Sequence, residues 1–242
     1  MKKTIRNFII TLITVGLMVF IIFKIKILDS ATPLFEVSFL STKYLNDTFA
    51  YQMTTLTLSL VTVLVTALLT DFQSLKLLSI KKIDGEVTSE PCIGISKNNR
   101  DTWKTLGRNM AIIISIVTAV VIYFQVYKSG VIQNLTFGSF ALVVIFALIN
   151  SFVEEVTFRH TFASITEYHK LNPNISKGLS AAIFGSIHYF GVPAKIPGVI
   201  IAGFLGWFLS KSIHETKGFF WAWLIHFVQD VIIMMALFLT SH

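Results

Sequence analysis

The chain has 242 residues, of which 54% are hydrophobic and 14% charged, and its mean hydropathy is +0.72. This composition is typical of a membrane protein and excludes an ordinary water-soluble domain. The net charge of +7 is not gathered in a dense basic cluster, so we expect the lipid bilayer and no nucleic acid as a partner.

Uncharged stretches recur along the sequence. A transmembrane helix needs about 20 mostly apolar residues, with a range of about 17–25. We therefore predict an all-α, polytopic membrane helical bundle of about seven transmembrane helices. Their apolar cores are residues 8–23, 49–70, 109–127, 129–153, 178–194, 196–210 and 218–242, of which the last is interrupted only by Asp230.

The distribution of Lys and Arg predicts the orientation of these helices, because basic residues near a span stay preferentially in the cytoplasm. With the N-terminus in the cytoplasm, 15 of the 20 basic residues fall on the cytoplasmic side. We therefore expect an integral membrane protein with a cytoplasmic N-terminus. The first span could also be a secretory signal, but residues 30–32 form only a weak cleavage site, and we expect the span to be retained.

We expect one integrated membrane domain with two parts. Residues 1–109 supply two N-terminal transmembrane helices and a cytoplasmic loop, and residues 110–242 supply the helical core. Within the loop, residues 85–101 are rich in turn formers and predict a small extramembrane lobe or a mobile loop.

The first polar motif, EEVTFR, follows 25 residues without a charge. An ionisable side chain inside a bilayer costs about 2.5–3.5 kcal/mol by insertion scales, so each needs a partner or a task. Glu155 and Arg159 are four residues apart, within ion-pair reach on one helix face. Glu154 points about 100° away and is left free for another role. Asn150 lies one turn before Glu154 and can hydrogen-bond it.

Two further motifs, FGSIH and HFVQD, lie in later spans. His188 follows a run of small residues that lets helices approach closely, so we expect it to face the bundle interior. His226 and Asp230 lie four residues apart on one face of the last span. At about 1.5 Å per residue, these side chains reach a depth similar to that of Glu154. The sequence predicts one polar chamber that opens to the cytoplasm.

The remaining histidines lie near predicted interfaces or the C-terminus. We expect them to be solvated and to have no catalytic role; they are His160, His169, His214 and His242.

The three motifs together resemble EExxxR, FxxxH and Hxxx followed by Asn or a similar polar residue, the motifs of the CAAX-protease and bacteriocin-processing (CPBP, or Abi) family. The resemblance covers about residues 110–240. It implies an intramembrane endopeptidase that hydrolyses a peptide bond of a membrane-associated protein or peptide. The family suggests CAAX-type processing, or bacteriocin maturation and self-immunity, and the compact length fits a member in a bacterial plasma membrane.

The resemblance also implies roles for individual residues. Glu154 matches the general base, and His188 matches a residue that helps to hold and activate the attacking water. His226 and Asp230 match the pair that stabilises the oxyanion. Glu155 and Arg159 match a structural ion pair.

Asp230 departs from the family pattern, in which Asn is frequent. An ionised Asp has no proton to donate to an oxyanion. Asp230 could therefore be protonated, orient His226 by accepting a hydrogen bond, or bind a metal. Imidazole and carboxylate groups are standard zinc ligands. The candidate metal ligands are Glu154, His188, His226 and Asp230. We prefer the metal-independent mechanism over a zinc metalloprotease.

Two other functions stay open at this point. Buried carboxylates and histidines also form proton relays, so a proton-coupled transporter is one alternative. The sequence lacks the repeated halves that many transporters display. An inactive relative could instead serve as a membrane scaffold or immunity protein.

Overall fold

The computed structural model describes residues 2–26, 36–95, 100–129 and 134–240. Within these ranges the chain forms helices and two isolated β-bridges but no strand. The α-helices are α1 (Lys2–Lys26), α2 (Lys43–Leu69), α3 (Trp103–Gln125), α4 (Phe137–Glu155), α5 (Thr161–Tyr168), α6 (Pro173–Ile187), α7 (Lys195–Thr216) and α8 (Phe220–Thr240). The predicted all-α bundle is confirmed. The cleavage site considered at residues 30–32 lies outside the described ranges.

Six stretches of the described chain are long and apolar enough to cross a bilayer, which makes this an integral membrane protein. They correspond to the predicted spans except residues 178–194. That segment forms α6, which has only 15 residues. Asn172 caps α6, Pro173 occupies its first turn, and a 3-10 turn at His188–Phe190 ends it. The prediction of a full-length span here is wrong because local capping and a turn shorten the helix.

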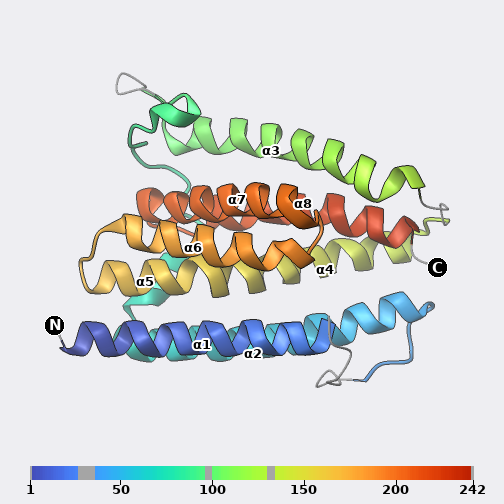
Figure 1. Ribbon diagram of the computed structural model, residues 1–242, viewed down its shortest axis with the longest axis horizontal. Coiled ribbons are helices and arrows are strands. Elements are labelled where there is room, and N and C mark those ends of the chain that lie inside the picture. Colours follow the sequence, from blue (N-terminus) through green and yellow to red (C-terminus); the bar gives the residue numbers. More distant parts are fainter. Residues whose placement is uncertain (1, 27–35, 96–99, 130–133, 241–242) are drawn as a thin grey trace.

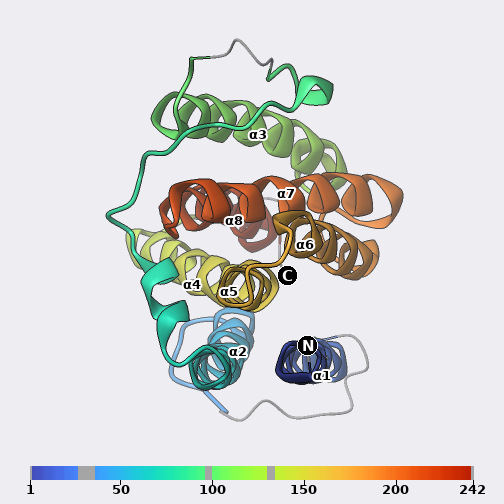
Figure 2. The ribbon, with the colours of Figure 1, turned by 90° about the vertical axis from the view of Figure 1, so that its left-hand side faces the viewer.

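The helices run side by side in one bundle (Figure 1). Helix α4 packs against α2 on one side and α8 on the other, and α8 also packs against α3. Helices α6 and α7 form a close pair, and α1 lies beside α2 at the edge of the bundle (Figure 2). The starts of α1 and α3 lie at the same end of the bundle as α5 (Figure 1), as the predicted topology requires. The cytoplasmic assignment of that end stays a prediction.

Glycines allow the close contact between α6 and α7. A Cβ atom on Gly185 would lie 2.9 Å from the carbonyl oxygen of Val199, and one on Gly206 would lie 2.6 Å from that of Ser180. Only glycine fits without a shift of backbone, so the two helices meet almost backbone to backbone. This contact fixes the end of α6, where His188 lies.

The segment between α2 and α3 is anchored to the bundle over its described residues. Lys211 of α7 is fully buried, and its Nζ donates to the Thr88 carbonyl oxygen at 3.1 Å and to Glu215 Oε1 at 2.6 Å. The same Nζ lies 3.4 Å from Glu90 Oε1. Trp103 Nε1 donates to Glu215 Oε2 at 2.8 Å. The described part of the predicted lobe is thus held to the end of α7.

Candidate active site

The first motif lies where α4 changes its helical geometry. Helix α4 is followed directly by a π-helical turn, Val156–His160 (η4), and then by α5. Residues 137–168 therefore form one continuous helical segment. The Thr161 hydroxyl donates to the Val156 carbonyl oxygen, five residues earlier, at 2.8 Å. Single π-turns inside α-helices occur frequently at functional sites. All five residues of η4 are buried.

Glu155 and Arg159 meet across this turn. Arg159 NH1 lies 3.2 Å from Glu155 Oε1, and both side chains are 0% exposed. The Arg159 guanidinium also stacks on Phe184 of α6, with Cζ 3.6 Å from the ring centroid. Ring faces attract cations, most strongly where water is excluded. The first and second motifs are therefore packed directly against each other.

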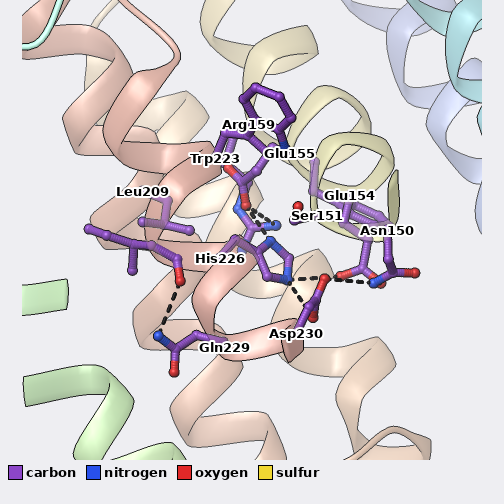
Figure 3. A network of polar contacts seen from close by, with 12 residues as sticks. Asn150, Ser151, Glu154, Glu155, Arg159, Leu209, Trp223, His226, Gln229 and Asp230 are labelled. Atoms are coloured by element: carbon purple, nitrogen blue, oxygen red, sulfur yellow. Dashed lines mark hydrogen bonds and ion pairs between the residues drawn. The ribbon is translucent and has the colours of Figure 1, made fainter. Parts of the chain in front are cut away.

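His226 of α8 lies among three carboxylates (Figure 3). Its Nδ1 is 2.7 Å from Glu155 Oε1, and its Nε2 is 3.3 Å from Glu154 Oε2 and 3.6 Å from Asp230 Oδ1. A neutral imidazole carries one N–H only. Both ring nitrogens face carboxylate oxygens, so the nitrogen without a hydrogen in a neutral ring needs a second ring proton, a protonated carboxyl as its donor, or a shared cation.

Asn150 of α4 links two of these carboxylates. Its Nδ2 donates to Glu154 Oε1 at 3.1 Å and to Asp230 Oδ2 at 3.0 Å (Figure 3). The bond to Glu154 agrees with the sequence expectation, whereas the bond to Asp230 was not expected. Gln52 of α2 donates in turn to Asn150 Oδ1 at 3.3 Å. Gln52 was not predicted, because it lies outside all three sequence motifs.

His188 lies beside this cluster. Its Nδ1 is 2.9 Å from the Phe184 carbonyl oxygen, which can only accept, so Nδ1 carries a hydrogen. The Phe184 ring centroid is 4.2 Å from that of His188 and 5.6 Å from that of His226. Phe184 thus contacts both imidazoles. The Nε2 of a neutral His188 keeps a lone pair that can accept a hydrogen bond from water.

The members of the cluster differ in their access to the surroundings. The Glu154 side chain is 20% exposed, compared with 8% for Asp230, 5% for His226 and 0% for Glu155. Water or a substrate can therefore reach Glu154 most readily. The structure brings Glu154, His226 and Asp230 together in direct contact and places His188 next to them.

Two of the four remaining histidines differ from the expectation of solvation. His160 is fully buried because the 3-10 helix Gln73–Leu78 (η1) covers it, and its Nε2 lies 2.9 Å from the Ser74 carbonyl oxygen. His214 is buried where α7 meets α5 and α6, with Nδ1 2.9 Å from Glu167 Oε1. His169 is at the protein surface near α1, and His242 lies outside the described ranges.

In the described part of the chain, no three or more His, Cys, Asp or Glu side chains are arranged to hold a metal ion. His226 Nε2 nevertheless faces two carboxylates of a type that zinc accepts, and His188 keeps one free ring nitrogen. The donor types fit zinc, and the metal alternative stays a prediction.

The fold and the cluster define a class of protein: a helical membrane protein with a buried carboxylate–imidazole centre suited to acid–base chemistry. Residues 136–232 match the family model described as Type II CAAX prenyl endopeptidase Rce1-like. The matched segment contains all three motifs, and it confirms over these residues the resemblance to the CPBP family of CAAX-type intramembrane proteases. No curated protein and no solved structure matches the chain significantly.

Proposed function

We propose that this protein is an intramembrane endopeptidase that hydrolyses a peptide bond of a membrane-associated protein or peptide. The observation that carries the proposal is the contact of Glu154 Oε2 with His226 Nε2 at 3.3 Å, inside the segment that matches a CAAX endopeptidase family. The substrate we propose is a CAAX-type C-terminal tail, and a bacteriocin leader or self-immunity substrate is the alternative within the same family.

The proposed reaction uses Glu154 as the general base. Glu154 accepts a proton from a water molecule, whose oxygen attacks the substrate carbonyl carbon and forms a tetrahedral oxyanion. The oxyanion then collapses, the C–N bond breaks, and the proton passes from Glu154 to the departing amine. A positioned general base contributes about 10²–10⁴-fold to the rate. His188 Nε2 is free to hold the water on its second side.

His226 is the proposed oxyanion donor. Glu155 fixes its ring through Nδ1, at 2.7 Å, so that Nε2 points into the space shared with Glu154 and Asp230. Donors that are already aimed at the developing charge stabilise a transition state without rearrangement. Asp230 can assist as a donor only when it is protonated. As a carboxylate it instead stabilises a protonated His226.

Zinc would find its ligands among Glu154, His188, His226 and Asp230. When bound, it would polarise the attacking water. The purified protein tests the zinc-dependent mechanism. Full activity after chelator treatment, with no zinc detected by elemental analysis, rules that mechanism out.

The test of the function is peptide cleavage by purified protein in liposomes. The probes are a fluorescent peptide ending in a prenylated CAAX tail and the same peptide without the prenyl group. We expect wild-type protein to cleave, and Glu154→Ala or His188→Ala to lower kcat by at least about 10²-fold. Asp47→Ala is the control, because Asp47 lies at the start of α2 and its side chain is 67% exposed. Full cleavage by both site variants would disprove the proposal.

The choice between the two substrate classes follows from the same assay. Cleavage that requires the prenyl group supports CAAX-type processing, and cleavage of both peptides supports a broader leader-peptide activity. Substrate trapping with Glu154→Gln in cells then identifies the natural substrate as the protein that accumulates on the inactive variant.

A further inference from the structure

Gln52 is a buried amide in a helix that lies outside the matched segment. It belongs to α2, which packs against α4, and its side chain is 1% exposed. Its Nε2 donates to Asn150 Oδ1 at 3.3 Å. An amide buried among apolar helices costs free energy unless it is hydrogen-bonded, and this contact satisfies the NH2 group of Gln52, whose Oε1 is buried without a partner among the described residues.

Gln52 differs from nearby polar residues of α2. The Ser59 hydroxyl donates to the Leu56 carbonyl oxygen at 2.8 Å, and the Thr62 hydroxyl donates to that of Leu58 at 3.1 Å. These hydroxyl groups are satisfied within their own helix. The Gln52 amide instead reaches across to the helix that carries the first motif.

The two carboxylates select the orientation of the Asn150 amide, and Gln52 supplies a donor to the oxygen that this orientation leaves on the side of α2. Asn150 uses its NH2 group for Glu154 and Asp230 and its oxygen for Gln52. The nitrogen and oxygen of an amide are distinguished by their partners. A flipped Asn150 would turn its oxygen toward both carboxylates, which is unfavourable, and in the observed orientation its oxygen accepts from Gln52 Nε2.

We propose that Gln52 is a positioning residue of the catalytic centre and acts through Asn150. By fixing the Asn150 amide, it holds the Glu154 and Asp230 carboxylates at a set separation, with both directed at His226. The inference rests on the proposed function. It also means that the N-terminal helices complete a centre whose motifs all lie within residues 136–232.

The principal test is Gln52→Met, which nearly preserves the volume of the side chain and removes its hydrogen bond. We expect kcat for the cleaved peptide to fall about tenfold, as for the loss of one neutral hydrogen bond, with KM and the melting temperature near those of wild type. Thr62→Val is the matched control, because Thr62 is buried in the same helix and donates to Leu58. We expect it to retain wild-type kcat.

A double-mutant cycle tests the route through Asn150. Since Gln52 acts only on Asn150, adding Gln52→Met to Asn150→Ala should cause no further loss of kcat. If the two substitutions lower kcat by independent factors that multiply in the double variant, Gln52 does not act through Asn150. Should Asn150→Ala fail to fold, Asn150→Leu, which preserves more of the side-chain volume, replaces it in the same cycle with the same expected result.

The outcomes separate the two proposals. Wild-type kcat in Gln52→Met overturns the positioning role while the protease assignment stands. A wild-type protein that cleaves neither peptide, nor any protein trapped by Glu154→Gln, overturns both.

Discussion

The Glu155 carboxylate serves two partners through one oxygen. Its Oε1 lies 3.2 Å from Arg159 NH1 and 2.7 Å from His226 Nδ1. A carboxylate oxygen has two lone pairs, so it can accept from both groups. The residue predicted to brace the bundle thus also orients the imidazole of the proposed oxyanion donor. Stability and activity should therefore depend on the same side chain.

The neighbouring glutamates allow a direct comparison of these roles. We expect Glu155→Gln to lower both kcat and the melting temperature, because it removes the carboxylate that pairs directly with the fully buried Arg159. Removal of one partner from a buried ion pair costs about 3–5 kcal/mol. Glu154→Gln should abolish cleavage with a smaller shift in melting, since Glu154 is partly exposed. Thermal melting in detergent and the peptide assay measure both effects, and equal melting of Glu155→Gln and wild type would contradict the brace.

At the scale of the helices, the end of α7 holds the segment that connects α2 and α3. The buried Lys211 joins Thr88, Glu90 and Glu215, which belong to two separate parts of the chain. Most of the other basic side chains near this end are exposed. A second buried lysine, Lys177 of α6, lies 3.7 Å from the same Glu90 oxygen, and Lys211 alone of the two also joins the segment to Glu215.

We expect Lys211→Met to loosen residues 84–95 from α7, because the Thr88 carbonyl oxygen loses its donor and Glu90 and Glu215 lose their shared cation, while Lys177 still pairs with Glu90. Hydrogen exchange of residues 84–95 should become faster, while exchange within α4 and α8 stays unchanged. The matched control is Lys217→Met, which removes a half-exposed lysine paired with Glu167 at the same end of the bundle. Unchanged exchange of residues 84–95 in Lys211→Met would show that other contacts hold the segment.

Contacts within one helix could be predicted from the sequence, and contacts between helices could not. The spacing of Glu155 and Arg159 predicts their proximity because the helix fixes it. The contacts of His226 with Glu155 and of Gln52 with Asn150 depend on how whole helices pack, which spacing does not encode. The meeting of the three motifs in one site could be predicted, because the motifs resemble those of a family and their side chains lie at a similar depth in the membrane.

The burial of side chains near the ends of the bundle also could not be predicted from the sequence pattern. His160 was expected to be solvated, but the η1 segment folds over it. The length of α6 was overestimated because hydropathy continues past the turn that ends the helix. In both cases, a tertiary contact or a local turn overrides the apolar pattern on which the prediction depended.

At the scale of the whole molecule, polar contacts at one end fasten α1 to the rest of the bundle. Asn7 Nδ2 donates to the Leu69 carbonyl oxygen at 2.8 Å and to His169 Nε2 at 3.2 Å. The Thr4 hydroxyl lies 3.3 Å from His169 Nδ1, and Lys3 Nζ donates to the Tyr168 hydroxyl at 2.9 Å. Much of the remaining surface of α1 is exposed and apolar, as suits contact with lipid. The His169 side chain thus links α1 to the end of α5.

Protonation of His169 should weaken this attachment. A protonated ring has no lone pair to accept the Asn7 hydrogen bond, and Asn7 cannot flip without losing its bond to Leu69. Partial burial and then the charge of Lys3 hold the pKa of His169 below its ordinary value of 6.5. A lowered pKa means that the folded state binds fewer protons than the unfolded state, so the contribution to stability is present above pH 6.5 and is lost as the pH falls through the folded pKa.

We therefore expect faster hydrogen exchange in the first turns of α1 as the pH is lowered below 6.5, after correction for the intrinsic exchange rate. The informative quantity is the difference between wild type and His169→Gln, because the comparison separates this side chain from every other effect of pH. The glutamine amide cannot be protonated in this pH range. Hydrogen exchange in the first turns of α1 should therefore depend little on pH in His169→Gln. If wild type and His169→Gln respond equally to acid, another group controls the docking of α1, because His169 is the histidine that contacts Thr4 and Asn7 in the described part of the bundle.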